Sequence, residues 1–166
     1  IPTLCFLKDI NEIGDCRMCV VEVEGRRGFA TSCIQKVEEG MVVKTNTPAV
    51  IEARRIVLDL ILSNHDRECL TCTRNGTCEL QKLAQEFYVD EIKYQGSRNK
   101  HEIDDISPAI VRDFNKCILC RRCVATCKKV QGIGAIDCTE RGFASTVSTY
   151  KNKSLNDVNL SLIHIW

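Results

Sequence analysis

The chain of 166 residues is poor in aromatic side chains, has no long apolar run and carries almost no net charge. Its aromatic content of 5% is low for a protein that must fill several cores with bulky side chains. The best candidate membrane segment, residues 51–62, falls short of the roughly 20 apolar residues that cross a bilayer and is interrupted by charges such as Arg54 and Asp59. Lys and Arg number 23 against 22 Asp and Glu, so no net field attracts nucleic acid or an anionic membrane. We therefore expect a soluble protein without nucleic-acid partners or membrane insertion.

What the chain has in excess is cysteine, with 12 residues. An even number of cysteines in a small chain often forms a disulfide framework. Here several cysteines stand only two residues apart, which places their thiolates around one ion or cluster. Such thiols stay reduced and available as ligands in a reducing cytosol, so we expect metal ligation and a cytoplasmic location. The closely spaced pairs are Cys16/Cys19, Cys69/Cys72, Cys117/Cys120 and Cys120/Cys123.

The first cysteine group has the pattern Cys-x10-Cys-x2-Cys-x13-Cys, formed by Cys5, Cys16, Cys19 and Cys33. Residues 19–24 are rich in β-branched side chains, residues 25–28 supply a turn and residues 29–33 return, which predicts a hairpin. A further strand is expected over residues 41–45. Four thiolates, three of them on loops, suit a [2Fe–2S] cluster, and a structural zinc site is the alternative.

The second group reads His-x3-Cys-x2-Cys-x5-Cys and consists of His65, Cys69, Cys72 and Cys78. A helix capped by Thr47, with Pro48 at its first position, is expected to present one broad apolar face and to deliver His65. Its charged residues, including Arg54 and Asp59, are expected to face water. A second helix is predicted over residues 79–88. One imidazole and three thiolates could hold zinc, but beside two other cysteine groups they favour a [4Fe–4S] cluster.

The third group reads Cys-x2-Cys-x2-Cys-x3-Cys and follows a polar connection, residues 94–105, in which His101 is expected to be solvated. A short strand over 107–114 should lead into the group, and a helix over 121–131 should follow, with Val124 and Val130 packed. In bacterial ferredoxins the first three cysteines of this run bind one [4Fe–4S] cluster and the fourth reaches a second. Cys138, before a strand over 141–149, is either a buried core residue or the missing fourth ligand. The run consists of Cys117, Cys120, Cys123 and Cys127.

With all three groups considered together, the sequence resembles the N-terminal electron-transfer region of the multisubunit, NAD(P)-linked [FeFe]-hydrogenases over nearly its whole length. The resemblance is carried by residues 1–5, 12–25, 65–80 and 117–142. It implies an α+β fold: a truncated β-grasp [2Fe–2S] domain over 1–46, a small helical [4Fe–4S] domain over 47–93 and a partial ferredoxin module over 94–166.

The resemblance also implies ligand roles. The first group would bind [2Fe–2S] and the second [4Fe–4S], through His65 and three cysteines. In the third group Cys117, Cys120 and Cys123 would hold one [4Fe–4S] cluster that lacks its fourth ligand here, and Cys127 would serve another. Compared with the family, the chain begins inside the first domain and ends before the second ferredoxin run. We therefore expect a fragment, with residues from about 160 onward not native.

The implied function is a relay of electrons between a flavin/NAD(P)H partner subunit and an [FeFe]-hydrogenase active site outside this chain, which itself contributes no catalytic residue. The implied partners are flavin/NAD(P)-binding and small ferredoxin-like subunits of one complex. Respiratory NADH dehydrogenase and NAD-dependent formate dehydrogenase share the first two sites. The three residues between Cys123 and Cys127 fit hydrogenases and formate dehydrogenases and are not expected of respiratory NADH dehydrogenase. Residues 130–143 look more like the hydrogenases. Formate dehydrogenase remains the alternative enzyme, and a zinc-binding interaction module is the alternative of another class.

Overall fold

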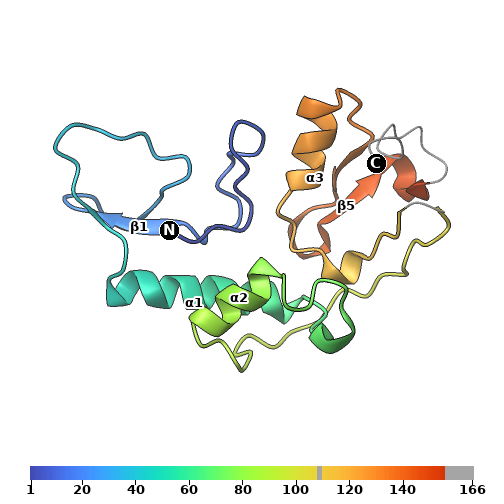
Figure 1. Ribbon diagram of the computed structural model, residues 1–166, viewed down its shortest axis with the longest axis horizontal. Helices are drawn as coiled ribbons and strands as arrows, with labels where there is room; N and C mark the ends of the chain where they lie inside the picture. Colours follow the sequence, from blue (N-terminus) through green and yellow to red (C-terminus); the bar gives the residue numbers. More distant parts are fainter. Residues whose placement is uncertain (108–109, 156–166) are drawn as a thin grey trace. The chain divides into compact units, whose positions relative to one another are not determined.

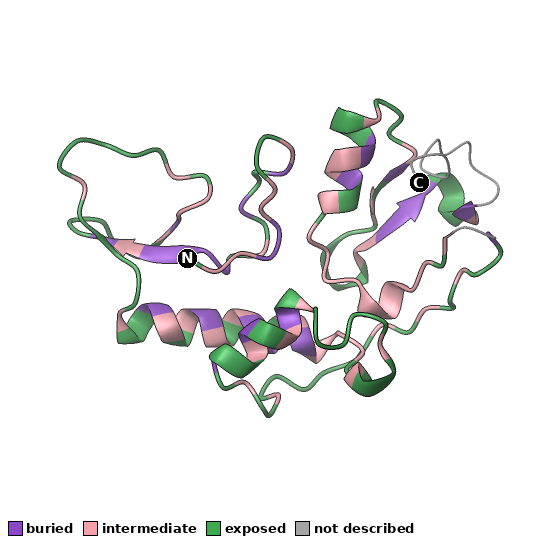
Figure 2. Ribbon diagram, in the orientation of Figure 1, coloured by how far each residue is buried: buried purple, intermediate pink, exposed green. Residues whose placement is uncertain are grey.

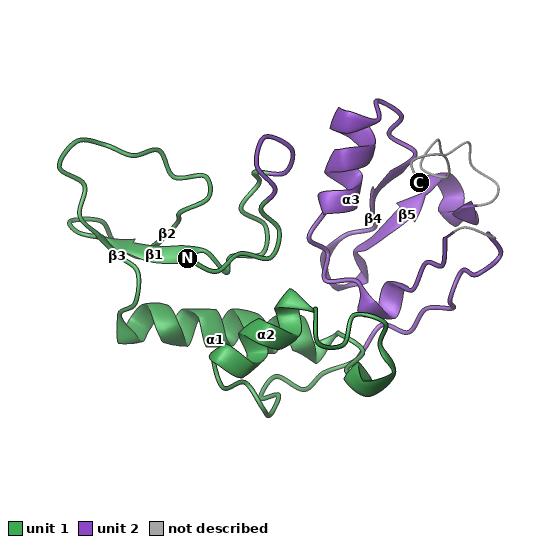
Figure 3. Cartoon of the chain, in the orientation of Figure 1, with its two compact units in different colours: residues 1–6, 12–97 green, residues 7–11, 98–166 purple. Residues whose placement is uncertain are grey.

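The computed structural model describes residues 1–107 and 110–155. It divides into two compact units, Ile1–Phe6 with Glu12–Ser97 and Leu7–Asn11 with Arg98–Trp166 (Figure 3). The first two cysteine groups lie in unit 1 and the third lies in unit 2. Among the described residues, no helix has the length and apolar character needed to cross a membrane. The division into three domains stays a prediction.

Unit 1 contains a small antiparallel sheet of β1 (Val20–Val23), β2 (Phe29–Thr31) and β3 (Val43–Lys44), in the order β2-β1-β3. Val20 pairs with Thr31 and Val23 pairs with Val43. The predicted hairpin is thus confirmed, whereas the third strand is shorter than the expected 41–45. Met18 and Val21, both almost fully buried, belong to the core of this unit.

Helix α1 (Pro48–Ser63) begins as predicted, because the Thr47 hydroxyl accepts a hydrogen bond from the Val50 N–H at 3.2 Å. Its apolar face buries Val50, Leu58 and Leu62. The expectation that Arg54 and Asp59 face water is wrong, since they are 3% and 4% exposed. The helix packs against β1 and also against α2 (Glu79–Glu86), so a single-face pattern underestimates what is covered (Figure 1).

Helix α2 is two residues shorter than the predicted 79–88, since Phe87 caps its C-terminal end. Leu80, Leu83 and Phe87 are buried, as the periodicity indicated. One face of α2 is exposed (Figure 2), and the charged residues Glu79, Lys82 and Glu86 lie among its exposed positions. The result is a helix pair joined through α1 to a three-stranded sheet.

Unit 2 is built around a hairpin of β4 (Ile136–Thr139) and β5 (Thr146–Thr149), in which Ile136 pairs with Thr149 and Cys138 with Val147. Helix α3 (Arg122–Ala125) continues into one π-helical turn, Thr126–Val130, and packs on β4. The buried core of the unit consists of Val124, Cys127, Ile136, Val147 and Leu155. The fold is therefore a small α+β arrangement in both units.

Several expectations for unit 2 need correction. Val130, expected to pack, is 55% exposed because the π-turn rotates it away from the α-helical register. In place of a strand over 107–114, of which 108 and 109 lie outside the described residues, one antiparallel bridge joins Asp104 to Arg112. The strand expected from 141 begins only at Thr146, after a 3-10 turn. Residues 160–166 also lie outside the described part of the chain.

Candidate metal centres

The structure brings the four cysteines of the first group together on the loops around β1 and β2. The Cys19 thiol lies 3.2 Å from the Cys33 sulfur, and the Cys16 N–H donates to the Cys5 sulfur at 3.4 Å. Cys5 and Cys19 are each 1% exposed. Between Cys16 and Cys19, Arg17 adopts a left-handed conformation with φ 60°, which non-glycine residues rarely do. Such strain is retained where the surrounding structure imposes it, as at binding loops.

Burial raises the pKa of the Cys33 thiol to about 12, and the hydrogen bond and charge of Cys19 act in the same direction. The sulfurs of Cys5 and Cys16 add to the repulsion. Burial also raises the pKa of Cys5, against the lowering effect of the Cys16 N–H. Both raised pKa values oppose ionisation of the Cys5 and Cys33 thiols, and the positive charge of a bound metal would favour their thiolate forms.

In the second group, His65, Cys69, Cys72 and Cys78 line one cavity of about 180 Å³. Helix α1 places His65 just beyond its end, where the His65 N–H donates to the Leu62 carbonyl at 3.3 Å. Cys69 opens a 3-10 turn and Cys78 precedes α2 as its N-terminal flanking residue. The four donors predicted from the spacing therefore line the same cavity.

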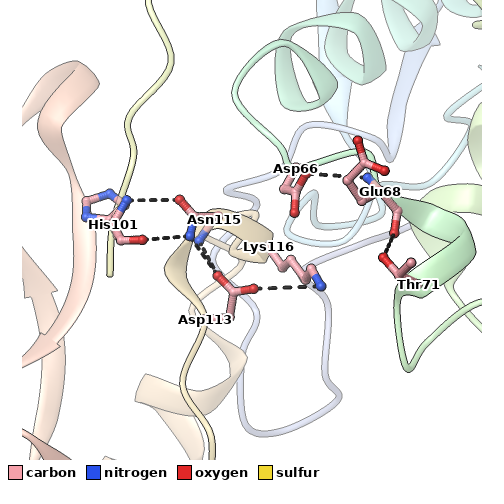
Figure 4. Close-up of polar contacts among 7 residues, drawn as sticks. All are labelled: Asp66, Glu68, Thr71, His101, Asp113, Asn115 and Lys116. Atoms are coloured by element: carbon pink, nitrogen blue, oxygen red, sulfur yellow. Dashed lines mark hydrogen bonds and ion pairs between the residues drawn. The ribbon is translucent and has the colours of Figure 1, made fainter. Parts of the chain in front are cut away.

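Two turns hold the loop between these ligands. Around Cys69, the Asp66 carboxylate accepts from the Glu68 N–H at 3.4 Å and the Thr71 hydroxyl donates to the Glu68 carbonyl at 3.2 Å (Figure 4). Before Cys78, the side chain of Gln81 clamps the Asn75-Gly76 turn: it accepts from the Gly76 N–H and donates to the Asn75 side chain, both at 3.0 Å.

The cysteine spacing gave no indication of a role for Gln81. Gly76, at φ 78°, requires the left-handed freedom of glycine, and an Asn-Gly pair is an ordinary signal for such a turn. The nearby glutamine, in the first turn of the following helix, was the available clue to the clamp.

Cys117, Cys120 and Cys123 also come together in unit 2. Although the Cys123 residue is exposed, desolvation of its sulfur raises the pKa of its thiol to about 11, and the Cys120 and Cys117 thiols act in the same direction. Burial raises the pKa of Cys117 as well, opposed by the Leu119 N–H, which donates to the Cys117 sulfur at 3.4 Å. Leu119 and Arg121, on either side of Cys120, both have left-handed backbones, with φ 55° and 59°.

Asn11 supports this loop from a distant part of the sequence. It is 2% exposed and its amide donates to the Cys120 carbonyl at 2.9 Å, within unit 2. No signal in the sequence pointed to this contact, because the two residues lie 109 positions apart.

The segment that enters the loop is fixed by a second amide. The Asn115 side chain accepts from the His101 N–H and donates to the His101 carbonyl, each at 2.9 Å, while Asp113 accepts from Asn115 (Figure 4). The His101 ring packs edge-on against Phe114, with centroids 5.6 Å apart. His101 is therefore half-buried rather than solvated.

The remaining two cysteines occupy different surroundings. Cys127 is fully buried within the apolar core of unit 2, and its role as a ligand of another cluster stays a prediction. Cys138, half-buried on β4, packs against the same core, and its charge also contributes to the raised pKa of Cys117. Both interpretations of Cys138 made from the sequence, core residue and fourth ligand, thus stay open.

All twelve cysteines are free of disulfide bonds. Across the described residues, no three His, Cys, Asp or Glu side chains converge on the position of one metal ion. The donor sets themselves, thiolates with a single imidazole, are those that hold iron–sulfur clusters.

Known proteins match all three parts of the chain. Residues 1–48 match the 2Fe-2S iron-sulfur cluster binding domain, 54–93 the NADH-ubiquinone oxidoreductase-G iron-sulfur binding region, and 107–164 the ferredoxin-like domain of NADH-quinone oxidoreductase subunit 3. The crystal structure of an NAD+-reducing [NiFe]-hydrogenase in the H2-reduced state contains a chain with a TM-score of 0.88 and 30% identity. The match covers 96% of this chain and 68% of that one. The chain belongs to the iron–sulfur subunit family of NAD(P)-linked dehydrogenases and hydrogenases.

Within this family, the NADP-reducing hydrogenase subunit HndD of Solidesulfovibrio fructosivorans is 47% identical over 95% of the chain and 28% of its own length. The mitochondrial NADH-ubiquinone oxidoreductase 78 kDa subunit of Neurospora crassa is 35% identical over 94% of the chain and 21% of its own length. The chain thus spans less than a third of these curated relatives. It is an iron–sulfur electron-transfer region with [2Fe–2S] and [4Fe–4S] binding domains.

Family membership confirms the predicted cluster types and the relay role, and it bears on the predicted enzyme only in part. The relatives include hydrogenases and NADH-ubiquinone oxidoreductases alike. The solved relative is of the [NiFe] type, whereas the sequence favoured the [FeFe] type.

Proposed function

We propose that the chain is the relay region of a larger NAD(P)-linked [FeFe]-hydrogenase subunit. The observation that carries this proposal is the 47% identity with a NADP-reducing hydrogenase subunit, which extends over 95% of the chain. The lower identity of 35% with the NADH-ubiquinone oxidoreductase subunit favours the hydrogenase.

The proposed ligands follow the three groups. In unit 1, one set surrounds [2Fe–2S] and the other [4Fe–4S]; in unit 2, three cysteines hold a further [4Fe–4S] cluster. When bound, these groups supply one-electron chemistry. The ligands are Cys5, Cys16, Cys19 and Cys33; His65, Cys69, Cys72 and Cys78; and Cys117, Cys120 and Cys123, with Cys127 assigned to another cluster.

The relay role asks for no acid, base or nucleophile from the chain's own residues. Their task is to fix the ligands, exclude water and set potentials through ligand type, hydrogen bonds and burial. The N–H groups of Cys16 and Leu119 already point at ligand sulfurs. Cys5 and Cys19 keep their sulfurs out of solvent.

The partners of the whole protein follow from the same proposal. A flavin and NAD(P)-binding subunit would exchange electrons with one end of the cluster relay, and a hydrogen-activating domain would exchange them with the other end. A small ferredoxin-like subunit would belong to the same complex. We place the complex in the cytoplasm, where free thiols stay reduced.

A [NiFe]-type hydrogenase is the second candidate, because the solved relative with a TM-score of 0.88 is of that type. Metal analysis of the complex purified with its partner subunits separates the two. We expect iron without nickel, and stoichiometric nickel would favour the second candidate.

The relay itself is tested on the full chain by iron, acid-labile sulfide and zinc analysis together with electron paramagnetic resonance. We expect iron and sulfide, one reducible [2Fe–2S] signal and at least one [4Fe–4S] signal. Zinc without sulfide would overturn the proposal in favour of a structural zinc module.

Single serine substitutions then test the ligands. Cys16→Ser should remove the [2Fe–2S] signal and leave the others. Cys138→Ser tests the residue whose role is open: loss of a [4Fe–4S] signal would make it the fourth ligand, and retention would make it a core residue.

A further inference from the structure

Arg54 is a full positive charge buried inside unit 1. It lies on α1, is 3% exposed, and its Nη2 donates to the carbonyl of Val20 at 2.8 Å. Val20 directly follows Cys19 in the chain. Arginine stays protonated in proteins, and burying a charge is costly unless another group compensates it.

The contacts of Arg54 in the described part of the chain leave its charge only partly compensated. The guanidinium lies 6.0 Å from the centre of the Phe87 ring, and Nε finds no hydrogen-bond acceptor. Burial lowers the pKa of Arg54, whereas the negative charges of Cys19 first and Glu86 second act to raise it. The hydrogen bond to the Val20 carbonyl, which directly follows Cys19 in the chain, places this buried cation next to a proposed cluster ligand.

We infer that Arg54 is the buried counter-charge of the [2Fe–2S] site and raises its reduction potential. Reduction by one electron adds a negative charge to the site, so a fixed cation nearby favours the reduced form. Because the guanidinium is buried, salt and water screen this attraction much less than they would at the surface. The inference rests on the proposed function, since it requires the first group to bind [2Fe–2S].

A purely structural role would account for the hydrogen bond to Val20 but would not require a charge. A glutamine at position 54 could also donate to that carbonyl. The two roles therefore make different predictions for Arg54→Gln, which removes the charge and keeps a donor, and for Arg54→Lys, which keeps the charge.

The matched control is Arg55→Gln on the same helix. The Arg55 side chain is 42% exposed, its Nε donates to the Phe87 carbonyl at 2.9 Å, and it lies 3.8 Å from Glu52. The change in formal charge is the same as in Arg54→Gln, but solvent screens it.

The experiment is a redox titration of the [2Fe–2S] signal in the full chain with its clusters assembled. We expect Arg54→Gln to shift the reduction equilibrium about tenfold toward the oxidised form, which is about 59 mV lower for one electron. Arg54→Lys should stay close to the unsubstituted protein, and so should Arg55→Gln.

An Arg54→Gln protein whose [2Fe–2S] signal has the same reduction potential as in the unsubstituted protein would overturn the inference, whatever the thermal stability of the variant. If Arg54→Gln fails to assemble the cluster, the Arg54→Lys variant is the test. An unchanged reduction potential in Arg54→Lys supports the role of the positive charge, and failure of Arg54→Lys to assemble the cluster refutes it. Absence of iron and sulfide from the unsubstituted protein would instead reject the proposed function.

Discussion

Replacing Asp104 with asparagine tests how much the contacts of its carboxylate stabilise unit 2, which contains the third cysteine group. The Asp104 carboxylate accepts from the Ser154 hydroxyl at 2.8 Å and from the Leu155 N–H at 3.1 Å, and it lies 3.0 Å from Nη2 of Arg112. Both charged side chains are largely buried, at 11% and 15% exposure. Arg112 also stacks 4.5 Å from the centre of the Phe114 ring, in the segment that leads to Cys117.

The cost of the substitution follows from these three contacts. Asparagine keeps one acceptor oxygen but turns an NH2 group toward a donor and leaves the Arg112 guanidinium without its counter-ion. A hydrogen bond to a charged group contributes about 1.5–3 kcal/mol, and bonds that share one carboxylate are not additive. We expect a local loss of about 2 kcal/mol, which also loosens Leu155 in the core.

Amide hydrogen exchange of β4 and β5 measures this loss where it occurs. A change of about 2 kcal/mol should speed exchange by roughly 30-fold. The control is Asp105→Asn, because Asp105 is adjacent and exposed and a surface change should stay within about 0.5 kcal/mol. Equal exchange in the two variants would refute the reasoning.

The pH dependence has a defined sign. The pKa of Asp104 lies below its ordinary value of 3.8, first because the Ser154 hydroxyl donates to it and then because of the Leu155 N–H and Arg112. The stability that this carboxylate contributes is therefore present above pH 3.8 and is lost as the pH falls through the lower, folded-state pKa. The difference in stability between the unsubstituted protein and Asp104→Asn should stay constant from neutral pH to about pH 4 and become smaller only below it.

Three further substitutions have defined outcomes. Asn11→Ala removes the amide that donates to the Cys120 carbonyl at 2.9 Å and should lower the free energy of unfolding, measured by chemical denaturation, by about 1–3 kcal/mol. An unchanged free energy of unfolding would indicate that water solvates this carbonyl instead. Thr47→Ala removes the cap on the Val50 N–H and should cost about 1 kcal/mol, and Thr47→Ser should restore it. His65→Cys should retain the middle cluster but lower its potential, because a thiolate adds negative charge; an unchanged titration would exclude His65 as a ligand.

Local signals in the sequence predicted the parts of the fold that depend on neighbours in the chain. The hairpin of β1 and β2 follows from β-branched residues around a glycine turn, and the start of α1 follows from Thr47 and Pro48. The cysteine spacings predicted the ligand sets, and the structure places the Cys19 and Cys33 sulfurs 3.2 Å apart and lines one cavity with the second group. That these sets bind clusters stays a prediction.

Contacts between distant segments could not be predicted in this way. Arg54 and Asp59 are charged residues on a helix, and their burial depends on β1 and on Lys93, whose N–H donates to Asp59 at 3.1 Å. The Asn11 contact with Cys120 depends in the same way on how the chain folds back within unit 2. No periodicity within one element carries that information.

The scarcity of aromatic residues has a structural counterpart in the buried positions. Among the described buried residues Phe87 is the one aromatic side chain, while Cys5, Cys19 and Cys127 are each at most 1% exposed. Cysteine is a small side chain and fills little volume by itself. Where its sulfur also binds a cluster, the inorganic core and the ligand bonds replace the packing that a larger side chain would supply, and cluster binding becomes part of the folding free energy. The first group, with two of these cysteines buried close to β1, is where that coupling should be strongest.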